Sequence, residues 1–268
     1  SNGARLVDFQ HGGAYGVYLA VPAEDISLEK EVFYTWGWDS REGFRKRLKK
    51  LPSPHLSRLR DSYSFGINKI LYIGTGLPRY HYRFHVSSLP EEFVQYLEDM
   101  KIFLQNLPVE LKYSLLYRPY PHEYGWNIKK IVKEVCPQAE LLEDVGTMSR
   151  LTDCMQKVRL CVIDHSHTSY IEALAINVPS IFFWNHDIHV MRPEAEEYFE
   201  LLRRAGILHK NPKGAMAKLV EVFNDPWTWW KSEAVQEARN TFLERFGYSR
   251  KDWMDYWAEE IRTLAKGL

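Results

Sequence analysis

Three features common in other proteins are missing from this chain, and each absence excludes a class of function. The 268 residues carry 35 Lys and Arg against 35 Asp and Glu, so the formal net charge is zero. A neutral chain has no general electrostatic attraction to nucleic acid or anionic lipid. No apolar run approaches the roughly 20 residues needed to span a bilayer, and no secretory signal is present.

Cysteine is also scarce. Cys136, Cys154 and Cys161 are an odd, unclustered set with no CxxC pair, which argues against a disulfide framework or a zinc site. A reducing, cytoplasmic setting is therefore expected. The opening residues Ser1-Asn2-Gly3 are typical of a cloning scar, which leaves open whether the chain is a fragment of a longer protein.

The stretch from Val158 to Trp184 organises the rest of the chain. An apolar strand, Leu160 to Ile163, runs into the polar cluster DHSHTS, which is followed by a helical pattern and a second strand, Ser180 to Trp184. Ser169 and Glu172 match a capping box, so we expect a helix to begin just after Ser169. A helix that starts at the end of a buried parallel strand favours anion binding.

The segments before this stretch alternate between strand and helix. Predicted strands cover Lys69–Ile73, Leu111–Tyr117 and Ala139–Leu142, and predicted helices cover Pro90–Leu107, Trp126–Cys136 and Thr147–Lys157. Such alternation predicts an α/β fold, a Rossmann-like doubly wound parallel sheet. Its strand ends would gather four loops on one edge, Gly74–Gly76, Arg118–Glu123, Glu143–Asp144 and Asp164–Ser169.

The remainder of the chain is predicted to be helical at its end and irregular at its start. The expected C-terminal helices are Pro193–Ala205, Lys213–Phe223, Trp227–Phe246 and Ser249–Leu264, whose tryptophans we expect to pack against the sheet. The basic, proline-broken run Arg41–Arg60 reads as a linker or solvated face, with a membrane-surface contact as the alternative. We place the boundary between an N-terminal remnant, residues 1–64, and a nucleotide-binding domain, residues 65–268.

A short strand at Leu6 to Phe9 leads into a glycine-rich turn, Gln10 to Gly16, that carries His11. The glycines let backbone approach a ligand closely, and a histidine at a strand end suits a catalytic base. An ordinary tight turn explains the same residues. Both interpretations stay open.

Several chemistries are compatible with the polar edge. His186–His189 and Asp164–His167 lack a standard zinc spacing, so no metal site is expected. A Ser-His-Asp hydrolase could use Ser166 or Ser169 with His165 and Asp164, although no G-x-S-x-G elbow is present. Phosphate recognition explains more residues at once, because Arg118 offers a bidentate fork, His122 a hydrogen bond, and the loop from Ser166 to Ser169 hydroxyls and amides.

Glu172 has two interpretations of equal weight. It caps the helix, or its carboxylate reaches sugar hydroxyls one turn beyond a phosphate loop. The segment Gly74-Thr75-Gly76 resembles a phosphate-approach turn but is short.

Four segments, FQHGGAYG, YIGTG, YRPYPHE and VIDHSHTSYIEALAINVPSIFFWN, occur in an order that resembles the C-terminal half of GT-B glycosyltransferases. The likeness extends to a transferase family of bacterial surface-polysaccharide and lipopolysaccharide loci, and more distantly to CDP-glycerol glycerophosphotransferases of teichoic-acid synthesis. His11-Gly12 matches the histidine-glycine pair of these relatives, and Asp164 to Ser169 matches their D-x-S-S-type loop. The segment from Arg118 to His122 departs from their R-x-H-P pattern, since its histidine follows a proline.

The resemblance implies roles for particular residues. His11 would be the base for an acceptor hydroxyl, and Glu172 would hold ribose or sugar. The donor and its phosphates would be bound by a set drawn from three loops, Gly74, Thr75, Gly76, Arg118, His122, Asp164, His165, Ser166, Thr168 and Ser169. A GT-B enzyme has two facing Rossmann-like domains, and this chain has room for one plus a remnant.

The sequence thus predicts a transferase that moves a sugar or polyol phosphate from a nucleotide-activated donor to a bacterial surface-glycan acceptor, glycan or lipid-linked, without a cofactor. A cytoplasmic location is expected, with peripheral inner-membrane contact left open. A nucleotide-sugar epimerase, a non-catalytic nucleotide- or sugar-binding module and the serine hydrolase remain alternatives. Fold-level resemblance does not identify the base, sugar or acceptor.

Overall fold

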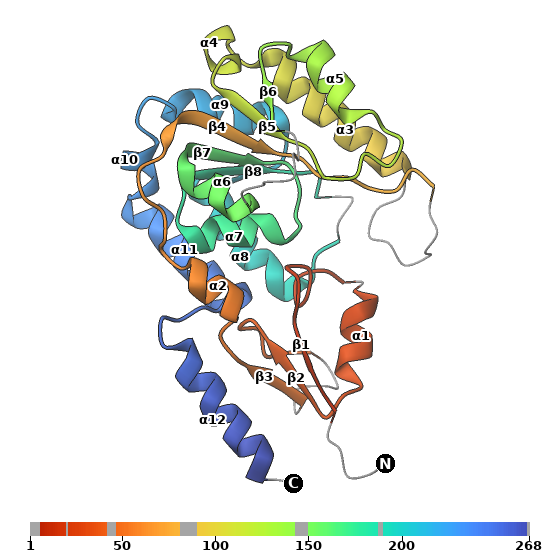
Figure 1. Cartoon of the computed structure of the whole chain (residues 1–268), viewed down its shortest axis with the longest axis vertical. Coiled ribbons are helices and arrows are strands. Elements are labelled where there is room, and N and C mark those ends of the chain that lie inside the picture. Colours follow the sequence, from red (N-terminus) through yellow and green to blue (C-terminus); the bar gives the residue numbers. More distant parts are fainter. Residues whose placement is uncertain are drawn as a thin grey trace.

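The computed structural model describes residues 6–19, 21–41, 47–80, 90–142, 150–186 and 190–266. Two parallel sheets lie one above the other in Figure 1, a large one formed by the middle of the chain and a small one formed by its start. The strands are β1 (Val7–Phe9), β2 (Val32–Thr35), β3 (Leu48–Lys50), β4 (Ile67–Ile73), β5 (Leu115–Arg118), β6 (Glu140–Leu141), β7 (Val158–Ile163), β8 (Ser180–Phe183) and β9 (Leu208–His209). The helices are α1 (Pro22–Leu28), α2 (Pro54–Leu59), α3 (Pro90–Asn106), α4 (Val109–Lys112), α5 (Ile128–Val135), α6 (Leu151–Lys157), α7 (Thr168–Ile176), α8 (Pro193–Arg204), α9 (Pro212–Val222), α10 (Pro226–Trp230), α11 (Glu233–Phe246) and α12 (Trp253–Lys266).

The large sheet has the order β6-β5-β4-β7-β8-β9, and every neighbouring pair is parallel. Counted from β4, this is the 3-2-1-4-5-6 order of a Rossmann-like sheet, so the predicted doubly wound α/β fold is confirmed. The strand order reverses between β4 and β7. Ligands of open α/β sheets bind at that reversal, beyond the carboxyl ends of the two strands.

Both faces of the large sheet are buried, as parallel sheets require. Successive residues of β7 point to opposite faces, so Leu160 and Val162 join α3, α5 and α9 in one core cluster. Cys161 and Ile163 join α6, α7, α8 and α11 in the other. Leu160, Val162, Cys161 and Ile163 are all fully buried, which explains the continuous apolar run read from the sequence.

The small sheet has the order β1-β2-β3, and the turn that follows β1 contacts α7 and the residues just before α8. The backbone amide of Gly13 donates to Thr168 Oγ1 at 3.1 Å. Tyr18 and Met191 form an antiparallel bridge, and the Arg192 amide donates to the Val17 carbonyl at 2.8 Å. The glycine-rich turn after β1 is therefore fastened to the first turn of α7.

The last helix, α12, packs on the small sheet rather than the large one. The Trp257 ring lies 5.4 Å from that of Phe9 and 5.7 Å from that of Tyr34, and the Tyr34 hydroxyl donates to Glu260 Oε1 at 2.6 Å. The domain boundary between residues 64 and 65 stays a prediction. Helix α12 belongs to the C-terminal segment in sequence but packs against β1 and β2 of the N-terminal segment. In the part of the chain described here, no helix is long and apolar enough to cross a membrane.

Several element boundaries differ from the sequence prediction for local reasons. The run Arg41–Arg60 contains β3 and α2 rather than only a linker, because Ser53 caps α2 by accepting from the Leu56 amide. The predicted strand Leu111–Tyr117 begins only at Leu115, since its first residues close helix α4. The predicted helix Trp227–Phe246 is two helices, α10 and α11, broken at residues 231–232.

Candidate functional site

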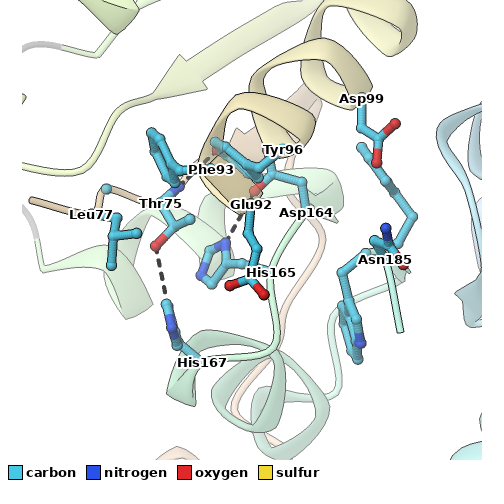
Figure 2. Close-up of a pocket in the computed structure, with 13 residues that line it drawn as sticks. Thr75, Leu77, Glu92, Phe93, Tyr96, Asp99, Asp164, His165, His167 and Asn185 are labelled. Atoms are coloured by element: carbon cyan, nitrogen blue, oxygen red, sulfur yellow. Dashed lines mark hydrogen bonds and ion pairs between the residues drawn. The ribbon is translucent and has the colours of Figure 1, made fainter. Parts of the chain in front are cut away.

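The reversal point of the large sheet brings two predicted site loops together. Thr75, in the loop after β4, has its hydroxyl 3.1 Å from Nδ1 of His167, in the loop after β7. The Thr75 amide donates to the Tyr96 hydroxyl of α3 at 3.0 Å. Figure 2 shows Thr75 and His167 on one side of the cavity that these loops border. The predicted association of the Gly74–Gly76 and Asp164–Ser169 loops is thus present.

A chain of buried hydrogen bonds fixes the loop after β7. The Tyr72 hydroxyl donates to Asp164 Oδ2 at 2.7 Å, and Asp164 Oδ1 lies 3.1 Å from His165 Nδ1. His165 Nε2 lies 2.7 Å from the Ser169 hydroxyl. These bonds are satisfied together when Nδ1 carries the imidazole proton and Nε2 accepts from Ser169.

The same order of groups, carboxylate to imidazole to hydroxyl, occurs in Ser-His-Asp hydrolases. Ser169 lies inside the first turn of α7, is 7% exposed, and lines neither of the two cavities described below. The chain of bonds therefore orients the loop. Within this chain of bonds Asp164 and His165 are hydrogen-bonded to each other. Their role in donor binding stays a prediction.

The predicted capping box at Ser169 and Glu172 is wrong. Helix α7 begins at Thr168 after the N-cap residue His167, which makes no side-chain cap. Ser169 is bonded to His165, and Glu172 Oε1 lies 2.7 Å from His55 Nε2. The spacing matches the motif, but the Glu172 side chain contacts His55 of α2 and the Ser169 side chain contacts His165 of the preceding loop.

A cleft cavity lies between the two sheets and contains His11. Its volume is about 440 Å³, and it is lined by Gln10, His11, Trp36, Ser53, Pro54, His55, Arg58, Thr168 and Glu172. Three predicted site residues therefore share one cavity: His11 from the start of the chain, and Thr168 and Glu172 from α7. Glu172 lines this cleft and does not cap α7.

His11 is exposed, and its ring nitrogens lie 3.0 and 3.1 Å from the Tyr15 hydroxyl. Burial, with the charges of Asp8 and Glu24, raises the pKa of Tyr15 to about 12. Tyr15 thus keeps its proton at neutral pH, and its hydroxyl holds the imidazole of His11 at the cleft.

Sequence reasoning missed His55 and Arg58, because both lie in the run interpreted as a linker. They are exposed residues of α2 and line the cleft opposite α7. A signal was present, since Ser53 followed by Pro54 is a typical N-cap and first-turn pair. Arg58 adds one positive charge to a cleft that also contains the carboxylate of Glu172.

A second, switch-point cavity lies against α3. It is lined by Thr75, Gly76, Leu77, Glu92, Phe93, Tyr96, Asp99, Asp164, His165, His167, Phe183, Trp184 and Asn185, with a volume of about 50 Å³. Three of these residues are carboxylic acids and none is Lys or Arg among the described lining residues. Sequence reasoning missed Glu92, Asp99 and Asn185, which carry no motif.

Three further predicted ligands line neither cavity. Arg118 is half-buried at the end of β5, with Nη1 3.6 Å from the sulfur of Cys154. His122 is exposed, in a ring cluster with Tyr120 and Tyr124, and its carbonyl borders Gly76. Ser166 is fully buried, and its hydroxyl has no partner among the described residues. All three stay predictions as phosphate ligands.

Some predicted features lie outside the described residues. The Glu143–Asp144 loop is one, and the stretch 187–189, which includes His189, is another. Among the residues that are described, no group of three or more His, Cys, Asp or Glu could hold a metal ion.

Comparison with protein families gives a match over almost the whole sequence. Residues 1–261 match the model of the LIC12162 family of transferases. The chain belongs to the LIC12162 transferase family. It is a transferase, as the sequence predicted. The search of curated proteins finds no match to the chain.

Solved structures give more distant likenesses. They include an O-GlcNAc transferase mutant from Thermobaculum terrenum, at 13% identity and TM-score 0.36, which covers 81% of this chain and 43% of that one. WaaG, a glycosyltransferase involved in lipopolysaccharide biosynthesis, is 11% identical with TM-score 0.41, covering 78% of this chain and 58% of that one. UDP-glucose:anthocyanidin 3-O-glucosyltransferase in complex with UDP is 12% identical with TM-score 0.31, covering 83% and 55%. The LIC12162 chain therefore spans about half the length of these structures.

Proposed function

We propose that this LIC12162 family transferase is a glycosyltransferase of GT-B type that moves a sugar, or a polyol phosphate, from a nucleotide-activated donor to a surface-glycan acceptor. The observation that carries the proposal is the shared cleft, in which His11 of the small sheet faces Thr168 and Glu172 of the Rossmann-like sheet. Transfer between two substrates needs both to meet in one cavity. The chain supplies mainly the donor side of that cavity.

The donor phosphates fit best at the first turn of α7. A helix start offers backbone amides and the positive end of its dipole to an anion. Thr168 adds a hydroxyl there, and Arg58 adds a positive charge across the cleft. Two further candidates for binding the same phosphates are Arg118, at the end of β5, and His122, in the loop after it.

In the proposed reaction the acceptor hydroxyl attacks the donor carbon or phosphorus that carries the nucleotide. His11 takes the hydroxyl proton, a new bond to the acceptor oxygen forms, and the bond to the nucleotide's phosphate oxygen breaks. The amides of α7 and Arg58 stabilise the charge on the departing phosphate. Glu172 holds a ribose or sugar hydroxyl, with His55 keeping its carboxylate in place.

The acceptor, its linkage to lipid and contact with the inner membrane belong to the same proposal. A transferase in the cytoplasm that extends a surface glycan meets acceptors built at the membrane, and the basic residues of α2 and its flanks suit such a surface. An epimerase of the same fold would instead act on a nucleotide sugar alone, and a binding module would turn over nothing.

The test measures nucleotide release from a panel of nucleotide sugars with surface-glycan extracts as acceptors, in the intact protein. His11→Ala should lower turnover by about 10²- to 10⁴-fold, the usual contribution of a general base, while donor affinity changes little. Conversion of the nucleotide sugar to its epimer without acceptor and without net nucleotide release would favour the epimerase. Unchanged turnover in the His11→Ala variant would remove the assigned role.

A further inference from the structure

The last helix, α12, carries an apolar stripe that the protein leaves partly uncovered. Trp253, Trp257 and Ile261 follow one another at intervals of four residues, so they lie on one face of the helix. The two tryptophans are only partly buried and Ile261 is 59% exposed, and Glu260 is the one buried residue that the structure describes in α12. A helix of a globular protein normally packs such a stripe into a core. The stripe of α12 therefore has surface available for a ligand.

This stripe forms one wall of an apolar groove beside the small sheet. The other wall is made by Phe9 of β1, Tyr34 of β2 and Trp36 just after it, at the carboxyl ends of the two strands. Figure 1 shows α12 running beside this sheet. Parallel α/β sheets bind ligands at the carboxyl edge. The groove has a volume of about 420 Å³, which is within the roughly 300–1,000 Å³ of small-molecule sites.

The polar side chains that border this groove are engaged inside the protein. The Tyr34 hydroxyl donates to Glu260 Oε1 at 2.6 Å, and the Trp257 indole N–H donates to the Pro52 carbonyl at 2.9 Å. Gln10 Oε1 accepts two internal hydrogen bonds, each of 2.8 Å. What these residues present to the groove is therefore mainly carbon surface. Such a surface suits a hydrocarbon chain, whereas a buried sugar would need partners for its hydroxyls.

The groove is continuous with the cleft that contains His11. Gln10, Trp36 and Pro54 line both spaces, and His11 directly follows Gln10 in the chain. A hydrocarbon chain in the groove would therefore bring a polar head attached to it into the cleft beside His11. The first turn of α7, where the donor phosphates are proposed to bind, contributes Thr168 to the same cleft.

We propose that this groove binds the alkyl chain of a lipid-linked acceptor and so holds the acceptor's polar head in the cleft. The inference rests on the proposed function, because it names the class of acceptor. A single chain suits a groove that is walled on two sides and opens into the reaction cleft. Ile261 and Trp257 then contact the acceptor's chain, and His11 contacts its head.

The first experiment varies the length of a chain on a constant head. Titration calorimetry of the wild-type protein uses hexyl, heptyl and octyl β-D-glucoside, each below its critical micelle concentration. Affinity should rise about two- to fourfold for each added methylene, the range expected for partial to full burial of that group. Equal affinity across the series, or no binding of octyl glucoside, would overturn the inference.

The second experiment changes the wall of the groove. Ile261→Gln places an amide on that wall and should weaken octyl glucoside binding about three- to tenfold. Met254→Gln is the matched control, because Met254 is 63% exposed on the same helix but does not line the groove. Both positions are exposed, so both variants should melt within about 2 °C of the wild type. Equal affinities in the two variants would place the chain elsewhere and overturn the inference.

The third experiment locates the polar head. Octyl glucoside should shift the imidazole NMR signals of His11, assigned with the His11→Ala variant, and leave those of His209 in the edge strand β9 unchanged. Binding without a shift at His11 would separate the groove from the acceptor and overturn the inference.

Two further outcomes keep the inference apart from its alternatives. If phosphatidylcholine vesicles sediment the protein while monomeric octyl glucoside does not bind, the groove contacts a bilayer and the inference is overturned. Glucoside binding needs neither donor nor turnover. A flat chain-length series therefore removes the acceptor class while transfer that depends on His11 stands, and unchanged turnover in His11→Ala removes the role of His11 while the groove still binds a chain.

Discussion

Asp99 links the switch-point cavity to stability. Its pKa is raised above the ordinary value near 3.8, chiefly by burial. A carboxyl whose folded-state pKa is raised contributes stability below its unfolded pKa and loses that contribution as the pH rises through the folded pKa. At neutral pH the ionised group therefore lowers the stability of the folded state.

We expect Asp99→Asn to raise the melting temperature at pH 7 by about 1 to 3 °C, a modest effect because the residue is half-exposed. Near pH 3, where the carboxyl is protonated in both states, the difference should vanish. Thermal unfolding followed by circular dichroism across this range measures it. A variant less stable at pH 7, or equally stabilised at both pH values, would contradict the account.

Individual side-chain roles were the hardest feature to predict from sequence. His11, Thr168 and Glu172 were expected in the site, and the fold brings them into one cleft. The spacing of the sequence pairs Glu172 with Ser169, because spacing shows only local partners. Its partner is His55, 117 positions away. Such pairs depend on packing between elements, which no spacing rule contains.

At the scale of elements, the contact between the glycine-rich turn and α7 decides whether His11 faces the donor loop. A Cβ on Gly13 would lie 2.8 Å from Ile171 Cδ1 and 3.3 Å from the Thr168 Cα, whereas one on Gly12 would lie 3.6 Å from Thr168 Oγ1. A side chain at Gly13 would therefore be crowded against α7, whereas Gly12 has room.

Gly13→Ala should push the turn away from α7, lower turnover at least tenfold and weaken folding by about 1 to 3 kcal/mol through overpacking. Gly12→Ala is the matched control and should change both quantities little. Nucleotide-release assays and urea unfolding test the pair. Equal effects of the two substitutions would show that the close approach has no functional role.

Elements with a strong hydrophobic period were predictable. The apolar strands β4, β7 and β8 and the amphipathic helix α3 appear at or near their expected residues, because burial on a fixed face leaves a repeating pattern. The short elements α1, β3 and α2 were not predicted. They hold few buried residues, and their positions depend on contacts with α7, α12 and the rest of the small sheet.

At the scale of the whole molecule, a buried ion pair helps to join the two sheets. Arg192 Nη2 lies 2.5 Å from Glu24 Oε1, both residues are at most 3% exposed, and the Gly16 amide donates to Glu24 Oε2 at 2.7 Å. Removing one partner of a buried pair leaves an uncompensated charge.

Glu24→Gln should lower the free energy of unfolding by about 3 kcal/mol, within the range for breaking buried pairs. The same change at Glu98, whose pair with Lys101 is on the surface, should cost at most about 1 kcal/mol. Urea titrations of both variants give the comparison. A similar small loss at both sites would mean that the pair does not hold the sheets together.

The architecture of the large sheet followed from alternation of strands and helices, but the relation of the two sheets did not. The sequence contains no sign that α12 returns to β1 and β2, because its contacts join residues more than 200 positions apart, such as Tyr34 and Glu260. The cleft containing His11 exists only through that arrangement and the joint at α7.

The most direct test of the central claim is a crystal structure of the protein with the nucleoside diphosphate that it binds most tightly. The account predicts the phosphates at the amides of Thr168 and Ser169, facing His11 across the cleft. A nucleotide bound with its phosphates elsewhere would contradict it.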